Sequence, residues 1–173
     1  MPGCILELPY PFKEYKIYPY WELIDVARRG ESTPFSGSFE EAVEELDRLM
    51  TESVRGQMVS DVPIGAFLSG GIDSSAIVAL IRKNFPSGQI NTFSIIHDSP
   101  ENDERIWARK VAERNGTNHV ELSLTGDLVR TNLELALSSF DQPSIDGFNT
   151  WFVSKLVKDA GITVALSGLG GDE

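Results

Sequence analysis

Two spacings of hydrophobic residues alternate along the chain. Short apolar runs rich in β-branched residues predict buried strands, at 64–68, 90–96, 119–124 and 162–166. Longer segments with apolar residues three or four positions apart predict helices, at 73–83, 103–115, 126–139 and 149–160. Short strands that alternate with longer helices are typical of a parallel sheet with helices on both faces. We therefore predict an α/β fold.

A further helix is predicted to precede the first of these strands. Ser38 and Glu41 have the spacing of a capping box, in which two side chains satisfy the first N–H groups of a helix. Apolar residues then recur at helical spacing and predict a face that packs on the sheet: Phe39, Val43, Leu46, Met50 and Val54. Residues 1–37 are rich in Pro, Gly and aromatic residues and predict an irregular lead-in, with extended pieces at 4–8 and 15–18 and a linker at 31–37. We therefore place a domain boundary between residues 37 and 38, with the α/β domain over 38–173.

The first predicted strand runs directly into a glycine turn and a helix, with the sequence Ser69-Gly70-Gly71-Ile72-Asp73-Ser74-Ser75. Glycines adopt backbone angles that let successive N–H groups surround one anion. The helix start adds unpaired N–H groups and about half an elementary positive charge. Phosphate or pyrophosphate is the natural ligand of such a site. The loop matches neither G-x-x-x-x-G-K-[ST] nor G-x-G-x-x-G, which excludes the two most familiar nucleotide loops.

A second glycine loop follows the last predicted strand. Its sequence, Ser167-Gly168-Leu169-Gly170-Gly171-Asp172-Glu173, ends in two carboxylates. In parallel α/β sheets ligands bind beyond the carboxyl ends of the strands, and both loops occupy that position. We therefore expect the two loops to face one ligand.

The two loops resemble those of the ATP pyrophosphatase (PP-loop) enzymes, whose first loop reads SGGxDS. With the strand at 92–96 and the segment at 18–23, the resemblance extends to the synthetase domain of the glutamine-dependent asparagine synthetase family. It implies an adenine nucleotide alpha hydrolase-like fold and an ATP-dependent, amide-forming ligase. Such an enzyme adenylates the aspartate side chain, releases pyrophosphate, and forms asparagine and AMP with ammonia from glutamine. The implied cofactors are ATP and Mg²⁺.

The resemblance also assigns roles to individual residues. The pyrophosphate would be held by Ser69, Gly70, Gly71, Asp73, Ser74 and Ser75, and the nucleoside by Leu68, Ile95, Ser167 and Gly168. Asp73 and Asp172 would hold magnesium, and Asp73 and Glu173 are the implied catalytic residues. A carboxylate repels polyphosphate unless a cation lies between them. From the sequence pattern alone, Asp73 is therefore either a helix cap or a magnesium ligand. The two histidines, His97 and His119, lie at strand ends and favour structural roles.

The identity of the acyl substrate stays open. Leu169 stands where asparagine synthetases often carry Glu, and β-lactam synthetases and peptide-cyclising relatives use the same two loops. Asp141, Gln142 and Asp146 fall where similar proteins approach the amino acid, although Pro143 also makes this segment an ordinary turn. An alternative of another class is a nucleotide-binding module without catalytic activity.

The net charge, the apolar stretches and the cysteine count limit the kinds of partner and the cellular location that we expect. The net charge of −11 argues against nucleic acid or anionic membrane as a partner, and PP-loop enzymes that thiolate tRNA should carry a basic surface. No apolar stretch is long enough to cross a membrane, and the single cysteine, Cys4, permits no internal disulfide. We expect a cytoplasmic protein whose substrates are small molecules.

The resemblance implies partners outside these residues. In the family a glutaminase domain with an N-terminal cysteine precedes the synthetase domain, whereas here Cys4 is internal and residues 1–37 resemble the end of that domain with its linker. The family continues past the second loop through a helical region with a catalytic lysine. We therefore expect a fragment, completed by a missing glutaminase domain or subunit, that binds nucleotide without making asparagine. Rapid glutamine-dependent turnover by the chain alone would contradict this expectation.

Overall fold

The computed structural model describes residues 2–97, 104–144 and 146–170 and divides the chain into two compact units, 1–46 and 47–173. The second unit contains a four-stranded sheet with the strand order β5-β4-β3-β6. Its strands are β3 (Ile64–Phe67), β4 (Asn91–His97), β5 (Asn118–Leu124) and β6 (Val164–Leu166). Each neighbouring pair is parallel, as predicted. All of the strands therefore end at the same edge of the sheet.

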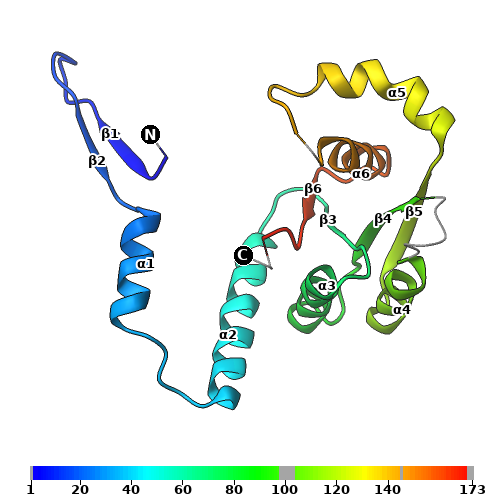
Figure 1. The fold of residues 1–173 in the computed structure, drawn as a ribbon, viewed down its shortest axis with the longest axis horizontal. Helices are drawn as coiled ribbons and strands as arrows, with labels where there is room; N and C mark the ends of the chain where they lie inside the picture. The colour runs from blue at the N-terminus through cyan, green and yellow to red at the C-terminus, as the bar shows by residue number, and fades with distance from the viewer. Residues whose placement is uncertain (1, 98–103, 145, 171–173) are drawn as a thin grey trace. The chain divides into compact units, whose positions relative to one another are not determined.

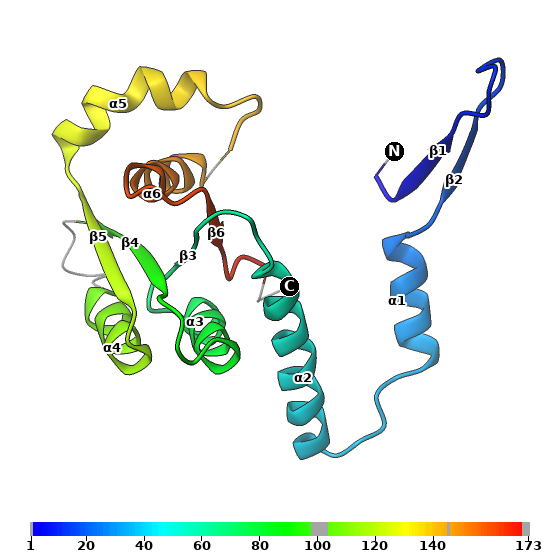
Figure 2. The same cartoon turned by 180° about the vertical axis from the view of Figure 1, so that it is seen from behind.

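Helices cover both faces of this sheet, as the sequence predicted (Figure 1). They are α3 (Ile72–Asn84), α4 (Arg105–Asn115) and α6 (Gly147–Asp159), whereas α5 (Gly126–Ser138) is drawn beyond α6 in Figure 1. Because side chains alternate along a strand, Ala66 of β3 packs with α3 and α4, whereas Phe67 packs with α6. The view from behind shows the same arrangement, with α3 and α4 on one side of the strands and α6 on the other (Figure 2).

The helix α2 (Phe39–Gln57) confirms the predicted capping box. The Ser38 hydroxyl accepts a hydrogen bond from the Glu41 backbone N–H at 3.2 Å, and the Glu41 carboxylate accepts one from the Ser38 N–H at 2.7 Å. The expected apolar face packs on the core only in its second half, through Met50 and Val54. In the first half Phe39 is 79% exposed, and Val43 and Leu46 are exposed with it. The two units divide after Leu46, within this helix.

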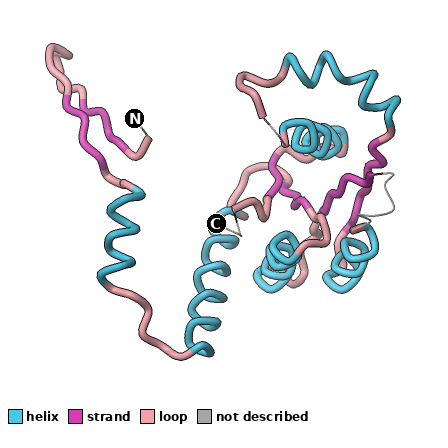
Figure 3. Tube along the Cα trace, viewed as in Figure 1, coloured by secondary structure: helices cyan, strands magenta, loops and turns pink. Residues whose placement is uncertain are grey.

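The first unit is more regular than the predicted lead-in (Figure 3). The strands β1 (Cys4–Glu7) and β2 (Lys16–Pro19) form an antiparallel hairpin close to the two predicted extended pieces. A helix, α1 (Leu23–Ser32), follows where we predicted irregular chain, and it includes the first residues of the predicted linker. The surrounding Pro, Gly and aromatic residues hid its short apolar pattern, and none of its residues is buried.

Arg82 at the end of α3 ties together the loops on the side of the sheet opposite the two glycine loops. Its guanidinium donates to the carbonyl oxygens of Pro86 and Gly88 at 2.9 Å each, and to those of Asn115 and Gly116 at 2.6 and 3.0 Å. One planar group thus satisfies carbonyls that follow both α3 and α4, which otherwise lack partners at helix ends.

We expect Arg82→Lys to lower the free energy of unfolding by roughly 2–3 kcal/mol, since a single ammonium cannot reach all of these carbonyls. Urea unfolding followed by circular dichroism measures the loss. Arg130→Lys is the matched control, because among the described residues Arg130 makes only an exposed ion pair with Asp127. Equal unfolding midpoints for the two variants would contradict the structural role of Arg82.

None of the helices in the described part of the chain is long and apolar enough to span a membrane.

Candidate nucleotide site

The first glycine loop leaves β3 at the carboxyl edge of the sheet and enters α3. Gly70 has a φ of 93°, and a Cβ there would lie 2.8 Å from the Ala108 nitrogen and 2.9 Å from the Glu104 oxygen. A side chain at this position is therefore excluded by both backbone conformation and space. The absence of a side chain lets the loop pack directly against the start of α4.

Hydroxyl groups hold the loop in shape. The Ser74 hydroxyl donates to the Gly71 carbonyl at 3.2 Å and lies 3.3 Å from the Ser69 nitrogen, whose N–H donates to it. The Ser69 hydroxyl lies 3.0 Å from that of Ser74 and accepts from the Gly71 N–H at 3.2 Å. Ser74 is buried, whereas Ser69 is exposed. The loop therefore has its shape without a ligand, and the exposed Ser69 is accessible to one.

The second glycine loop lies against the first. Strand β6 pairs directly with β3, with Ala66 opposite Leu166, so the two loops leave neighbouring strands at the same edge. A Cβ on Gly168 would lie 2.8 Å from the Ser74 nitrogen and 3.0 Å from the Asp73 carbonyl carbon. The structure therefore brings residues 69–75 and 167–168 together, as the sequence predicted.

A cavity of about 410 Å³ opens at this edge. Both loops contribute to its wall, through Ser69, Ser167 and Leu169, and the strand ends contribute Leu68 and Ile95. Its remaining lining includes Ser94 and Ile96 of β4, Glu104 and Arg105 at the start of α4, and Asn149 and Thr150 of α6. Apolar walls with a few polar groups suit a ring system with a polar tail. The nucleoside positions implied by resemblance (Leu68, Ile95, Ser167) thus border one cavity.

Of the two predicted magnesium ligands, Asp73 is the one that lies in the described part of the chain. This residue is half-buried in the first turn of α3 and touches Gly168 of the second loop. Within residues 2–97, 104–144 and 146–170, no group of three or more His, Cys, Asp or Glu residues could hold a metal ion. Magnesium takes only one or two carboxylates when phosphate oxygens and water complete its shell, so Asp73 fits that donor set. Asp172 and Glu173 lie outside the described residues.

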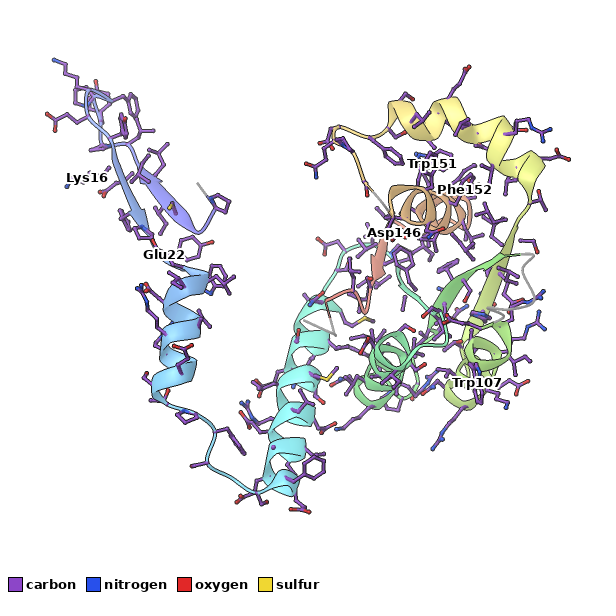
Figure 4. The ribbon with its side chains drawn as sticks, viewed as in Figure 1. Lys16, Glu22, Trp107, Asp146, Trp151 and Phe152 are labelled. Atoms are coloured by element: carbon purple, nitrogen blue, oxygen red, sulfur yellow. The ribbon has the colours of Figure 1, made fainter. Side chains whose placement is uncertain are left out.

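The three residues expected near the amino-acid substrate, Asp141, Gln142 and Asp146, differ in their position relative to the cavity. Asp146 lies at the start of α6 and lines the cavity (Figure 4). Its carboxylate accepts hydrogen bonds from Asn149 at 2.8 Å and Thr150 at 3.2 Å. Asp141 and Gln142 are exposed and do not line the cavity. Of the three residues, Asp146 alone borders the cavity, and the substrate role of the segment stays a prediction.

Sequence reasoning missed the polar residues that the structure places beneath the loops. Ser94 and Thr92 are buried within the apolar run of β4, and Glu104 and Arg105 begin α4. The signal for the first pair was available, because a polar side chain in a buried strand must find a hydrogen-bond partner. Arg105 carried no such signal, since its position depends on how α4 packs against Gly70.

His119 lies between the sheet and α4, in a chain of polar groups. Its Nδ1 lies 2.9 Å from the Thr92 hydroxyl and its Nε2 lies 3.5 Å from the Glu121 carboxylate. Arg109 of α4 donates twice to Glu121, at 2.8 and 2.6 Å. Burial lowers the pKa of His119 from its ordinary 6.5, outweighing the attraction of Glu121. The bond from Arg109 lowers the pKa of Glu121.

These shifts predict the pH dependence of stability. Because the pKa of His119 is lower in the folded chain, the unfolded chain binds more protons below about pH 6.5 and the free energy of unfolding falls there. The lowered pKa of Glu121 adds a separate loss at more acidic pH, below about 4.5. Urea titrations between pH 5 and 8 should show a shallower decline in His119→Gln than in the wild type. Parallel profiles would contradict the assignment.

Comparison with known proteins decides the family. The family model for asparagine synthase matches residues 45–173. This match is most of the chain and includes the whole of the second unit. The chain belongs to the asparagine synthase family. Two curated relatives agree: asparagine synthetase [glutamine-hydrolyzing] 3 of Bacillus subtilis strain 168 is 32% identical, over 91% of this chain. Putative asparagine synthetase [glutamine-hydrolyzing] 2 of Methanocaldococcus jannaschii is 33% identical, over 93% of this chain.

The asparagine synthase relatives are much longer than the chain, which spans 27% and 30% of their lengths. Among solved structures, the U34-tRNA thiolase NcsA of Methanococcus maripaludis matches with a TM-score of 0.56 and 15% identity, over 75% of this chain and 46% of that one. At this identity the likeness concerns the fold alone. The fold is of the PP-loop ATP pyrophosphatase type, as predicted.

Proposed function

We propose that the chain binds Mg-ATP at the carboxyl edge of its sheet, as the nucleotide-binding part of an asparagine synthase-family ligase. The contact between the two loops is the observation that carries the proposal. Gly168 packs on Asp73 and Ser74 at the start of α3, and both loops border one cavity. A nucleotide in that cavity can place its adenine against the ends of β3 and β4 while its phosphates reach the first loop.

Each residue then has a definite task. Backbone N–H groups at Gly70 and at the start of α3 would face the pyrophosphate, and the Ser69 and Ser75 hydroxyls would add donors. Asp73 and Asp172 are the proposed magnesium ligands, and Mg²⁺ when bound neutralises phosphate charge. Glu173 is the proposed catalytic carboxylate at the acyl group. The protein contributes positioning and electrostatic stabilisation, without a covalent intermediate on its own side chains.

The proposed reaction is formation of a β-aspartyl-adenylate and pyrophosphate, followed by attack of ammonia to give asparagine and AMP. We propose that a glutaminase domain or subunit supplies the ammonia, as the names of the curated relatives suggest for those proteins. The net charge of −11 favours small-molecule substrates over nucleic acid or anionic membrane as partners. We also propose that the protein acts in the cytoplasm. A chain that binds Mg-ATP and forms no adenylate is the non-catalytic alternative.

Leu169 favours a second candidate, a related amide ligase with a less polar acyl substrate. This side chain is 91% exposed and lines the cavity in the second loop. An apolar residue at this place attracts apolar surface better than it attracts a free amino acid. β-Lactam synthetase-like and peptide-cyclising enzymes are the relatives of this kind that the two loops allow.

Pyrophosphate exchange into ATP distinguishes these functions. We expect isothermal titration calorimetry to show binding of Mg-ATP by the wild-type chain. Labelled pyrophosphate should enter ATP only when an acyl substrate is present, with aspartate as the first to try. Exchange with no acyl substrate would point away from asparagine synthesis, and no binding of Mg-ATP would refute the proposed function.

A further inference from the structure

One peptide group connects β3 to the first glycine loop and is held at both ends. The carbonyl of Leu68 accepts a hydrogen bond from the Ser94 hydroxyl, and the N–H of Ser69 donates to the Ser74 hydroxyl at 3.3 Å. The two hydroxyls come from different elements, β4 and α3. Hydrogen bonds at both ends leave this peptide group one orientation.

The surroundings of Ser94 fix the direction of its hydrogen bond. Ser94 is 6% exposed, and its oxygen lies 3.4 Å from Nε2 of His119. Because its single proton goes to the Leu68 carbonyl, the hydroxyl can only accept from His119. Nε2 of a neutral ring then carries the proton, and Nδ1 accepts from the Thr92 hydroxyl, which in turn pairs with Thr117 at 2.8 Å. These partners account for the proton of each hydroxyl.

The orientation of this peptide group matters for binding an anion. If the group turned over, the Leu68 carbonyl oxygen would replace the Ser69 N–H beside Ser74, at the start of the loop. A carbonyl oxygen carries partial negative charge, so the flipped group would add a repulsive charge to the phosphate-binding loop at the place where the native N–H donates to the Ser74 hydroxyl. The Ser94 hydroxyl opposes this flip, because the flip would leave it without the carbonyl to which it donates.

We propose that Ser94, supported by His119, is a positioning residue for the pyrophosphate loop, which it fixes through the Leu68–Ser69 peptide group. Its importance for ligand binding rests on the function proposed above. Its effect on the loop does not, because the hydrogen bonds are present in the chain without ligand. Ser94 also lines the cavity at the carboxyl edge of the sheet.

Ser94→Ala and Thr92→Val test this role as a matched pair. Both replace a buried hydroxyl of β4, but Thr92 bonds only to Thr117 and His119 among the described residues and does not contact the loop. In the ligand-free chain we expect the Ser69 amide to exchange with deuterium about tenfold faster in Ser94→Ala than in Thr92→Val. Calorimetry with Mg-pyrophosphate should show about tenfold weaker binding for Ser94→Ala alone.

Equal Ser69 exchange in the two variants would overturn the positioning role, and so would equal affinity for pyrophosphate. If Ser94→Ala does not fold, Ser94→Cys provides the same comparison, because its thiol has similar shape and is a weak donor. A wild-type chain that binds neither Mg-pyrophosphate nor Mg-ATP would refute the proposed function instead. The exchange measurement would then still decide whether Ser94 fixes the loop.

Discussion

Replacing Gly168 by Ala should separate the two glycine loops and weaken Mg-ATP binding by tenfold or more, on the order of 1–3 kcal/mol of overpacking. The added Cβ would lie 2.8 Å from the Ser74 nitrogen and 3.0 Å from the Asp73 carbonyl carbon. Both neighbours are backbone atoms at the start of α3, which cannot move aside without displacing the loop. Calorimetric titration with Mg-ATP measures the effect.

Gly56→Ala is the matched control for this substitution. Gly56 lies within α2, and a Cβ there has no heavy atom within 4 Å. Because alanine is favoured over glycine inside a helix by roughly 0.5–1 kcal/mol, this variant should be slightly more stable and bind Mg-ATP normally. Normal Mg-ATP binding by Gly168→Ala would show that the second loop does not share the ligand of the first.

Asp73→Ala should reduce pyrophosphate exchange by at least about 10²-fold, as expected for the loss of one preorganised charged group. If Asp73 is a magnesium ligand, the variant should also need more magnesium to bind ATP. Exchange assays over a range of magnesium concentrations separate this role from that of a helix cap, because removal of a cap lowers stability without changing the magnesium requirement.

The matched control for Asp73 is Asp127→Ala. Asp127 also lies in the first turn of a helix, α5, but its side chain is exposed and pairs with Arg130. We expect this variant to keep the wild-type exchange rate wherever exchange is measurable. An unchanged exchange rate and magnesium requirement in Asp73→Ala would refute the metal role.

The sequence predicted the fold well because its signals are local and strong. The strand at 119–124 alternates polar and apolar residues, and the capping box at Ser38 forms the reciprocal hydrogen bonds that its spacing predicts. The meeting of the loops also followed from a general rule, since parallel strands end at one edge of a sheet. These predictions required no knowledge of which side chains pack together.

Other features depend on packing that local patterns do not encode. α1 has a short apolar pattern among Pro, Gly and aromatic residues, so its helix was missed. Asp146 lines the cavity and Asp141 does not, which depends on where α6 meets the sheet and not on sequence spacing. The bond from Ser94 to Leu68 joins positions 26 residues apart through the pairing of β3 and β4.

A titration of the chain with Mg-pyrophosphate, followed by backbone amide chemical shifts, tests the central claim most directly. If the two loops hold one ligand, the amides of Gly70, Gly71 and Gly168 should shift together and fit one dissociation constant. Shifts confined to one loop, or different constants for the two loops, would contradict the account.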